Sequence, residues 1–110
     1  MDTTKTLQNA LELVNGDRAK QNGDKIVNHD NIARLWSGYL TNKFRANIIL
    51  NTADVALLMV LLKVARTQHG KFNEDDYVDI CGYGGIAGEL KEALDKLSDT
   101  LGENNNSNGQ

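Results

Sequence analysis

The sequence has no proline, a single cysteine and few aromatic residues, and each scarcity narrows the possible fold. Proline is absent from all 110 residues, and aromatic residues make up only 5% of them. Sandwiches of short strands are rich in aromatic residues and turn-forming prolines, so this composition favours a helical protein. Cys81 is the lone cysteine, which excludes an intramolecular disulfide and fits a reducing cytosol.

A surplus of basic residues and a long apolar run are also missing. The formal net charge is −3, whereas proteins that bind duplex DNA usually carry a basic stripe. The longest apolar run, Val55 to Leu62, is far short of the ~20 residues that span a bilayer. The opening residues lead into a polar amphipathic pattern rather than a signal peptide. We therefore expect a cytoplasmic protein that binds neither duplex DNA nor a membrane.

The apolar residues that are present recur at helical spacing, and 110 residues suffice for one domain. The pattern predicts helices over about 4–14, 28–40, 52–67 and 73–101. The segment 41–51 fits either a short helix or an extended piece. We expect an all-α fold, a compact bundle of four or five helices that assembles into a homo-oligomer. Residues 1–101 form the single domain, and the polar, low-complexity residues 102–110 are expected to be a disordered tail.

The helix predicted over 52–67 is apolar around more than half of its circumference. Such a helix belongs at the centre of a bundle or in an oligomer interface. Asp54 shares one face with Leu58 and Leu61, and either complements the helix dipole or contacts a ligand. Lys63 and Arg66 lie one turn apart and could together engage phosphate, although a lone lysine in so apolar a helix usually extends to the surface.

The last predicted helix has two opposed faces. Cys81, Gly84, Gly85 and Gly88 fall within one arc. Each helical glycine costs about 1 kcal/mol relative to alanine, so a closely packed helix, or less commonly a flat ligand, is expected against that arc.

The opposite face carries Asp76, Asp79 and Tyr83. Two carboxylates one turn apart can share a metal ion, or can simply favour the helix dipole in a solvated first turn. We expect the solvated role for Asp76, and a ligand contact at Asp79 beside Tyr83.

The polar segment after the first helix supplies further candidates. Arg18 offers a bidentate contact, Asp24 is an acceptor, and Asn28 and Asn31 can bind amide or base edges. Polar side chains are also ordinary in loops. The sequence contains no Gly-x-x-x-x-Gly-Lys phosphate loop, no Cys/His cluster and no nucleophile with a His/Asp partner.

Four blocks together resemble a family of small phage and prophage helical proteins of unknown function, related to the nucleotide-modification-associated domain. The blocks are Leu11-x-x-Val14-x-Gly16-Asp17-Arg18, Asn31-Ile32-Ala33-x-Leu35-Trp36, Asp54-Val55-Ala56-x-x-Met59-x-x-Leu62-Lys63-x-Ala65-Arg66 and Asp76-Tyr77-Val78-Asp79-Ile80-x-Gly82-Tyr83. More distantly, the chain resembles the all-α pyrophosphohydrolases of the MazG type. Those enzymes bind magnesium through a Glu-Glu-x-x-Glu block and a later Glu-x-x-Asp block. Here Asp76-x-x-Asp79 could replace the second block, and only Asp54 precedes it.

Three functions follow from these residues and this resemblance. The preferred one is a phage protein, in the cytoplasm of an infected bacterium, that sequesters a nucleotide or nucleotide-derived signal without catalysis or cofactor, thereby countering host defence. Its expected ligand contacts are Arg18, Asp24, Asn28, Asn31, Asp54, Lys63, Arg66, Asp79 and Tyr83. The alternative is a magnesium-dependent nucleoside triphosphate pyrophosphohydrolase that uses Asp54, Asp76 and Asp79. The third is a structural oligomerisation module with the glycine arc as its seam.

Overall fold

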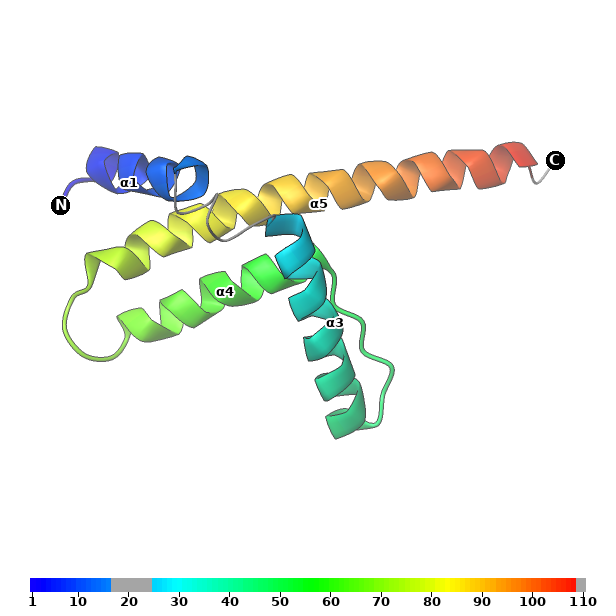
Figure 1. Ribbon diagram of the computed structural model, residues 1–110, viewed down its shortest axis with the longest axis horizontal. Helices are drawn as coiled ribbons and strands as arrows, with labels where there is room; N and C mark the ends of the chain where they lie inside the picture. Colours follow the sequence, from blue (N-terminus) through cyan, green and yellow to red (C-terminus); the bar gives the residue numbers. More distant parts are fainter. Residues whose placement is uncertain (17–24, 109–110) are drawn as a thin grey trace.

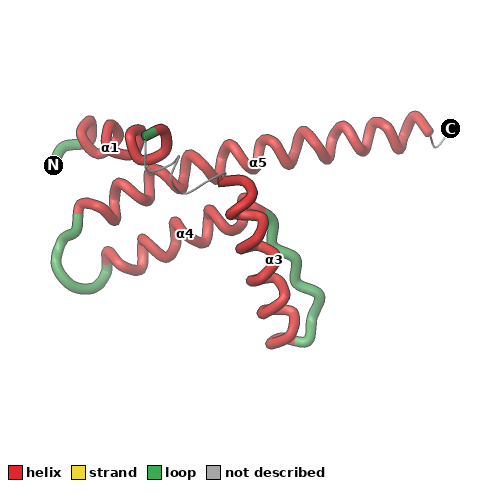
Figure 2. Tube along the Cα trace, in the orientation of Figure 1, coloured by secondary structure: helices red, strands yellow, loops and turns green. Residues whose placement is uncertain are grey.

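Helices are the only regular secondary structure in the part of the chain that the structure describes. The computed structural model describes residues 1–16 and 25–108, with side chains over 1–16 and 27–102. The helices in chain order are α1 (Thr3–Asn15), α3 (Lys25–Phe44), α4 (Thr52–Thr67) and α5 (Glu74–Asn108). The prediction of an all-α fold is therefore confirmed, and Figure 2 shows no strand among these residues. None of these described helices combines the length and apolarity needed to cross a membrane.

An antiparallel hairpin of α4 and the first half of α5 organises the fold. Figure 1 shows α1 beside α5, α3 crossing near the start of α4, and the second half of α5 projecting alone. The radius of gyration is 17.1 Å, whereas a fully compact chain of this length has one of about 13 Å. The compact bundle thus comprises α1, α4 and the first half of α5, and α3 and the end of α5 extend from it.

The start of α4 is fixed by a capping box. The Asp54 backbone N–H donates to Asn51 Oδ1 over 2.8 Å, and the Asn51 N–H donates to Asp54 Oδ2 over 3.0 Å. This pair satisfies two of the N–H groups that a helix terminus leaves without partners. Asp54 is thereby held in a structural role, and α4 spans the predicted 52–67.

The helix predicted over 28–40 is longer at both ends in the structure, since α3 runs from Lys25 to Phe44. Arg45 ends it in the left-handed region, with φ of 53°. This conformation is common at the first residue after a helix, where it reverses the chain direction.

The segment left open at 41–51 is therefore helical at first and then extended. Its second part returns alongside α3 and is held by two hydroxyl groups one helical turn apart. Thr41 Oγ1 donates to the Ile48 carbonyl and accepts from the Ile48 N–H, both over 3.0 Å. The Leu50 N–H donates to Ser37 Oγ over 2.8 Å. These bonds replace the ladder partners that an isolated extended segment lacks.

The core lies between α4 and α5 and consists largely of alanine. Its buried members are Ala53, Ala56, Ala87 and Leu90, with Ile86 and Leu94 packed against them. Small side chains on facing helices allow the two backbones to approach closely, and the hairpin does so at the end far from its turn. The large apolar residues of α4 mostly point elsewhere.

Two expectations for α5 differ from the structure. The helix continues through Asn108, past the expected tail start at residue 102, since extending an existing helix is far easier than nucleating one. The glycine arc is also open. A Cβ added at Gly84, Gly85 or Gly88 would meet nothing within 4 Å, whereas one added at Gly82 would lie 3.6 Å from Val14 Cγ1, an ordinary contact distance. The predicted close packing of Gly84, Gly85 and Gly88 is thus absent within the described chain.

Candidate functional site

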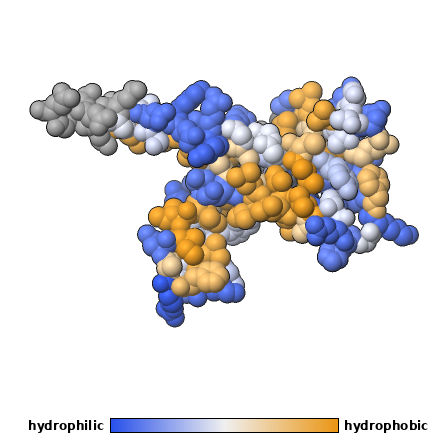
Figure 3. Space-filling model, turned by 180° about the vertical axis from the view of Figure 1, so that it is seen from behind, coloured by the Kyte–Doolittle hydropathy of each residue, from blue (hydrophilic) through white to orange (hydrophobic). Residues whose placement is uncertain are grey.

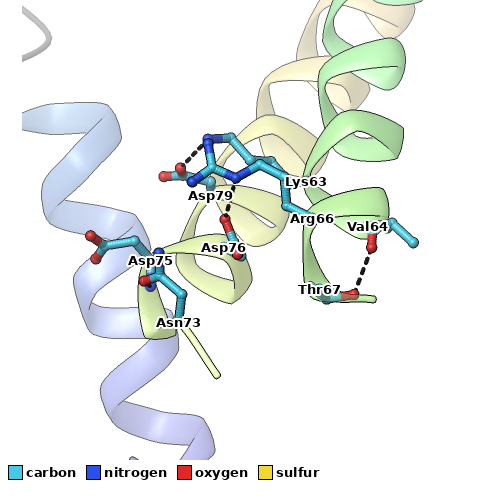
Figure 4. Close-up of polar contacts among 8 residues, drawn as sticks. All are labelled: Lys63, Val64, Arg66, Thr67, Asn73, Asp75, Asp76 and Asp79. Atoms are coloured by element: carbon cyan, nitrogen blue, oxygen red, sulfur yellow. Dashed lines mark hydrogen bonds and ion pairs between the residues drawn. The ribbon is translucent and has the colours of Figure 1, made fainter. Parts of the chain in front are cut away.

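Two ion pairs join α4 to α5 near the hairpin turn, where they form a short ladder (Figure 4). Lys63 Nζ lies 2.9 Å from Asp79 Oδ2, and Arg66 Nε lies 3.1 Å from Asp76 Oδ1. In an antiparallel pair of helices, residues equally far from the turn face one another. A step of three along α4 therefore matches a step of three back along α5.

Asp76 is buried, which corrects the expectation of a solvated first-turn carboxylate. It is 4% exposed, because it faces α4 rather than water. Its Oδ1 is close to Arg66 Nε but accepts no hydrogen bond from a described residue. Buried carboxylates require compensation by charge or hydrogen bonds, and the adjacent guanidinium supplies the charge.

Lys63 likewise does not extend to the surface as a lone lysine would. Its side chain is 14% exposed and that of Asp79 is 21% exposed. Removing either partner would leave a charge in a largely desolvated position. The four residues that the sequence offered as separate anion and metal ligands thus neutralise one another in pairs.

A basic pocket lies beside this ladder, at the end of the hairpin. Its volume is about 430 Å³. It is lined by Leu62, Ala65, Arg66, His69, Lys71, Asn73 and Asp76. Asn73 caps α5, since its Oδ1 accepts from the Asp75 N–H over 3.0 Å. Gly70 makes the turn with φ of 76°, a value that glycine adopts without strain.

The other predicted ligand residues do not join this pocket. Asp54 belongs to the capping box at the far end of α4, nine residues or ~13 Å of helix from Lys63. Asn28 and Asn31 are exposed on α3, and Tyr83 is half-buried on α5. Arg18 and Asp24 lie outside the described residues.

The three carboxylates of the magnesium alternative are also separated. Among the described side chains, no three of His, Cys, Asp or Glu are grouped so that they could hold a metal ion. Asp76 and Asp79 share a helix face, but each is directed to its own basic partner. Asp54 is at the opposite end of the hairpin.

A second recess, of about 310 Å³, separates α1 from α5. Its walls are mainly apolar and include Leu7, Leu11, Cys81, Gly85 and Ile86. No residue predicted to bind the ligand lines it. This recess is best explained by incomplete packing between α1 and α5.

Comparisons with known proteins identify the family. Residues 5–91 match the family described as Domain of unknown function (DUF6378). The chain belongs to this family. The match covers α1, α3, α4 and the first half of α5, which includes the ion-pair ladder and the basic pocket.

The relatives of this DUF6378 chain include two phage proteins. It is 38% identical to the Gene 55 protein of Mycobacterium phage L5 over 85 residues, 77% of this chain and 51% of that protein. It is 35% identical to the Gene 55 protein of Mycobacterium phage D29 over 86 residues, 78% of this chain and 53% of that protein. The chain thus spans about half the length of these curated relatives and is a phage protein. No solved structure matches it.

Sequence reasoning missed three polar residues of the DUF6378 pocket, His69, Lys71 and Asn73. The signal was present, because all three lie in the short turn between α4 and α5, next to Arg66 at the end of α4. A turn of this length brings such residues to one end of a hairpin.

Proposed function

We propose that this phage protein binds a small phosphate-bearing molecule, of the nucleotide type, in the basic pocket and does not cleave it. The observation that carries the proposal is the convergence of Arg66, His69 and Lys71 on one pocket. Basic side chains grouped around a concave surface favour an anionic ligand.

Arg66 retains binding capacity despite its ion pair. Its side chain is 53% exposed, and Nε is the atom that lies near Asp76. A guanidinium carries five N–H donors in a planar fork, so its terminal nitrogens can still donate to phosphate oxygens. Asp76 then orients Arg66 from behind, as partners of ligand-binding groups commonly do.

The pocket also suits the remainder of a nucleotide. Its volume of about 430 Å³ lies within the range of ~300–1,000 Å³ that is usual for small-molecule sites. Leu62 and Ala65 give it an apolar wall, against which a flat base could lie. Asn73 contributes an amide that can bind polar ring edges.

Binding without cleavage is favoured by the state of the carboxylates. Pyrophosphohydrolysis assisted by magnesium requires several carboxylates converging on the metal. Asp76 and Asp79 instead contact Arg66 and Lys63. In a phage protein, stable binding of a nucleotide signal would lower its free concentration in the host, and this is the sequestering role that we propose.

The proposal is tested by a thermal-shift panel of inorganic phosphate, pyrophosphate, nucleoside mono- and triphosphates and cyclic dinucleotides. A true ligand at 100 times its Kd stabilises the folded state by about 2.7 kcal/mol and raises the Tm accordingly. Lys71→Ala should weaken the ligand that binds best about tenfold, or ~1.4 kcal/mol. Lys96→Ala is the matched control, since Lys96 is exposed and pairs only with Glu92 on the distal part of α5.

A panel in which no compound raises the Tm would refute the proposal. Equal loss of affinity in Lys71→Ala and Lys96→Ala would show that binding occurs elsewhere. The hydrolase alternative is tested by incubating the protein with nucleoside triphosphates and Mg²⁺ and separating the products by anion exchange. Pyrophosphate release that Asp79→Asn abolishes would favour that alternative.

A further inference from the structure

The outer face of α4 carries a row of large apolar side chains that remain partly or largely exposed in the described chain. We call Leu57, Leu58, Leu61 and Val64 the leucine face. Their exposed fractions range from 36% to 60%. Figure 3 shows hydrophobic side chains gathered over the middle of the molecule, where α4 and α3 lie. Monomeric proteins rarely expose contiguous apolar patches of this kind.

We propose that the leucine face is a dimer interface, on which α4 of a second copy packs antiparallel about a twofold axis at Leu61. Leu61 lies near the middle of the leucine face, which runs from Leu57 to Val64, so an axis at this position lets the two faces overlap. A twofold interface joins the same patch of both subunits and must therefore be self-complementary. A row of leucines meets this condition, because apolar side chains can interdigitate with their own kind.

The surface area of the chain is that of a subunit rather than of a finished monomer. The total is 8221 Å², whereas a compact monomer of 12.1 kDa exposes about 6,000 Å². Two copies would together carry an excess of about 4,400 Å², within the ~2,000–5,000 Å² that obligate homodimers bury in total. The extended shape of the chain accounts for part of this excess, and the exposed leucine face contributes apolar area to it.

The small core leads to the same conclusion. Val55 is the only large side chain described as fully buried, and three of the four members of the central cluster are alanines. Chains whose own core is small commonly complete it with a partner. A permanent partner of this kind is most simply another copy of the chain.

The helix dipoles favour the antiparallel direction. Antiparallel packing places the positive end of each α4 dipole beside the negative end of the other, whereas parallel packing would align the two dipoles. The interface requires no nucleotide and does not depend on the proposed function.

The oligomeric state tests this inference directly. Sedimentation equilibrium of the full chain at micromolar concentration should give twice the mass of 12.1 kDa. Leu61→Glu should raise the dimer dissociation constant at least a hundredfold, by burying two facing carboxylates. Leu97→Glu makes the same change at another exposed leucine, on the projecting part of α5, and should remain dimeric. A wild-type monomer, or a Leu61→Glu variant that stays dimeric, overturns the inference.

A cross-linking experiment keeps the inference testable if Leu61→Glu does not fold. In the Cys81→Ser background, Leu61→Cys places one thiol per chain at the twofold axis. Oxidised glutathione should convert it to a disulfide-linked dimer, because the two cysteines meet within disulfide distance. Leu97→Cys in the same background should remain largely uncross-linked. Equal cross-linking at both positions, or none at Leu61→Cys, overturns the inference.

Discussion

The face of α4 that packs on α5 carries small residues, and its outer face carries large ones. The small residues are the buried ones. Ala53 and Ala56 face α5 with 2% and 0% exposure, whereas Leu57 and Leu61 on the outer side are 51% and 60% exposed. A helix that packed only within its chain would bury its leucines first. The inner face thus allows close backbone approach to α5, and the outer face leaves its leucines exposed in the described chain, as the proposed dimer requires.

The inner face should be the more sensitive of the two to added volume. Ala56→Leu inserts three carbons where α4 and α5 touch, and we expect a loss of about 3 kcal/mol in the free energy of unfolding. Urea denaturation at one fixed protein concentration measures this loss. Ala93→Leu adds the same volume at an exposed position of α5 and should change stability by less than about 0.5 kcal/mol. Equal midpoints for Ala56→Leu and wild type would contradict the close packing of the hairpin.

The ion-pair ladder at the edge of the inner face gives the next largest effect. Arg66→Ala leaves the buried Asp76 carboxylate without its counter-charge, which should cost about 2 kcal/mol. Removing that carboxylate as well, in Arg66→Ala/Asp76→Ala, should restore most of the loss, because no buried charge then remains. Urea denaturation without nucleotide measures all three proteins.

Arg34→Ala is the control for this prediction. Arg34 and Asp30 form an ion pair on α3 with both side chains largely exposed, and such pairs contribute about 0.3–0.5 kcal/mol. A double variant less stable than Arg66→Ala would contradict the buried-charge argument and would indicate that Asp76 contributes mainly by packing.

The fold was predictable where local signals coincide. For α4, the dense apolar run predicts a helix whose bounds match the observed 52–67, although the residue that caps it is Asn51 and not Thr52, the cap expected from the sequence. The segment 41–51 was not predictable, because hydroxyls of Ser37 and Thr41 hold its extended part. The spacing of apolar residues along the sequence carries no information about such tertiary hydrogen bonds.

The candidate site was predictable by residue but not by arrangement. Lys63, Arg66, Asp76 and Asp79 were each singled out from their helix faces, yet their mutual pairing depends on the register of the hairpin. The length of the short turn between the two predicted helices determines this register, because residues equally far from the turn face one another across the hairpin. Burial of Asp76 followed from the same register and could not be inferred from its position in a first turn.

The smallest expected effect concerns the open glycines of α5, and its sign is more informative than its size. Gly84→Ala should stabilise the protein by about 0.5–1 kcal/mol, because alanine lowers the cost of ordering a helix and its methyl group meets nothing within 4 Å. Gly38→Ala on α3 is the matched control, since Gly38 is also exposed, helical and free of neighbours within 4 Å. Equal gains in stability in the two variants would mean that nothing contacts the glycine arc, in agreement with the leucine face as the assembly surface. A gain in Gly38→Ala with a loss in Gly84→Ala would mean that another chain or a ligand contacts the glycine arc. In that case the leucine face of α4 would be only one part of the surface through which the protein assembles.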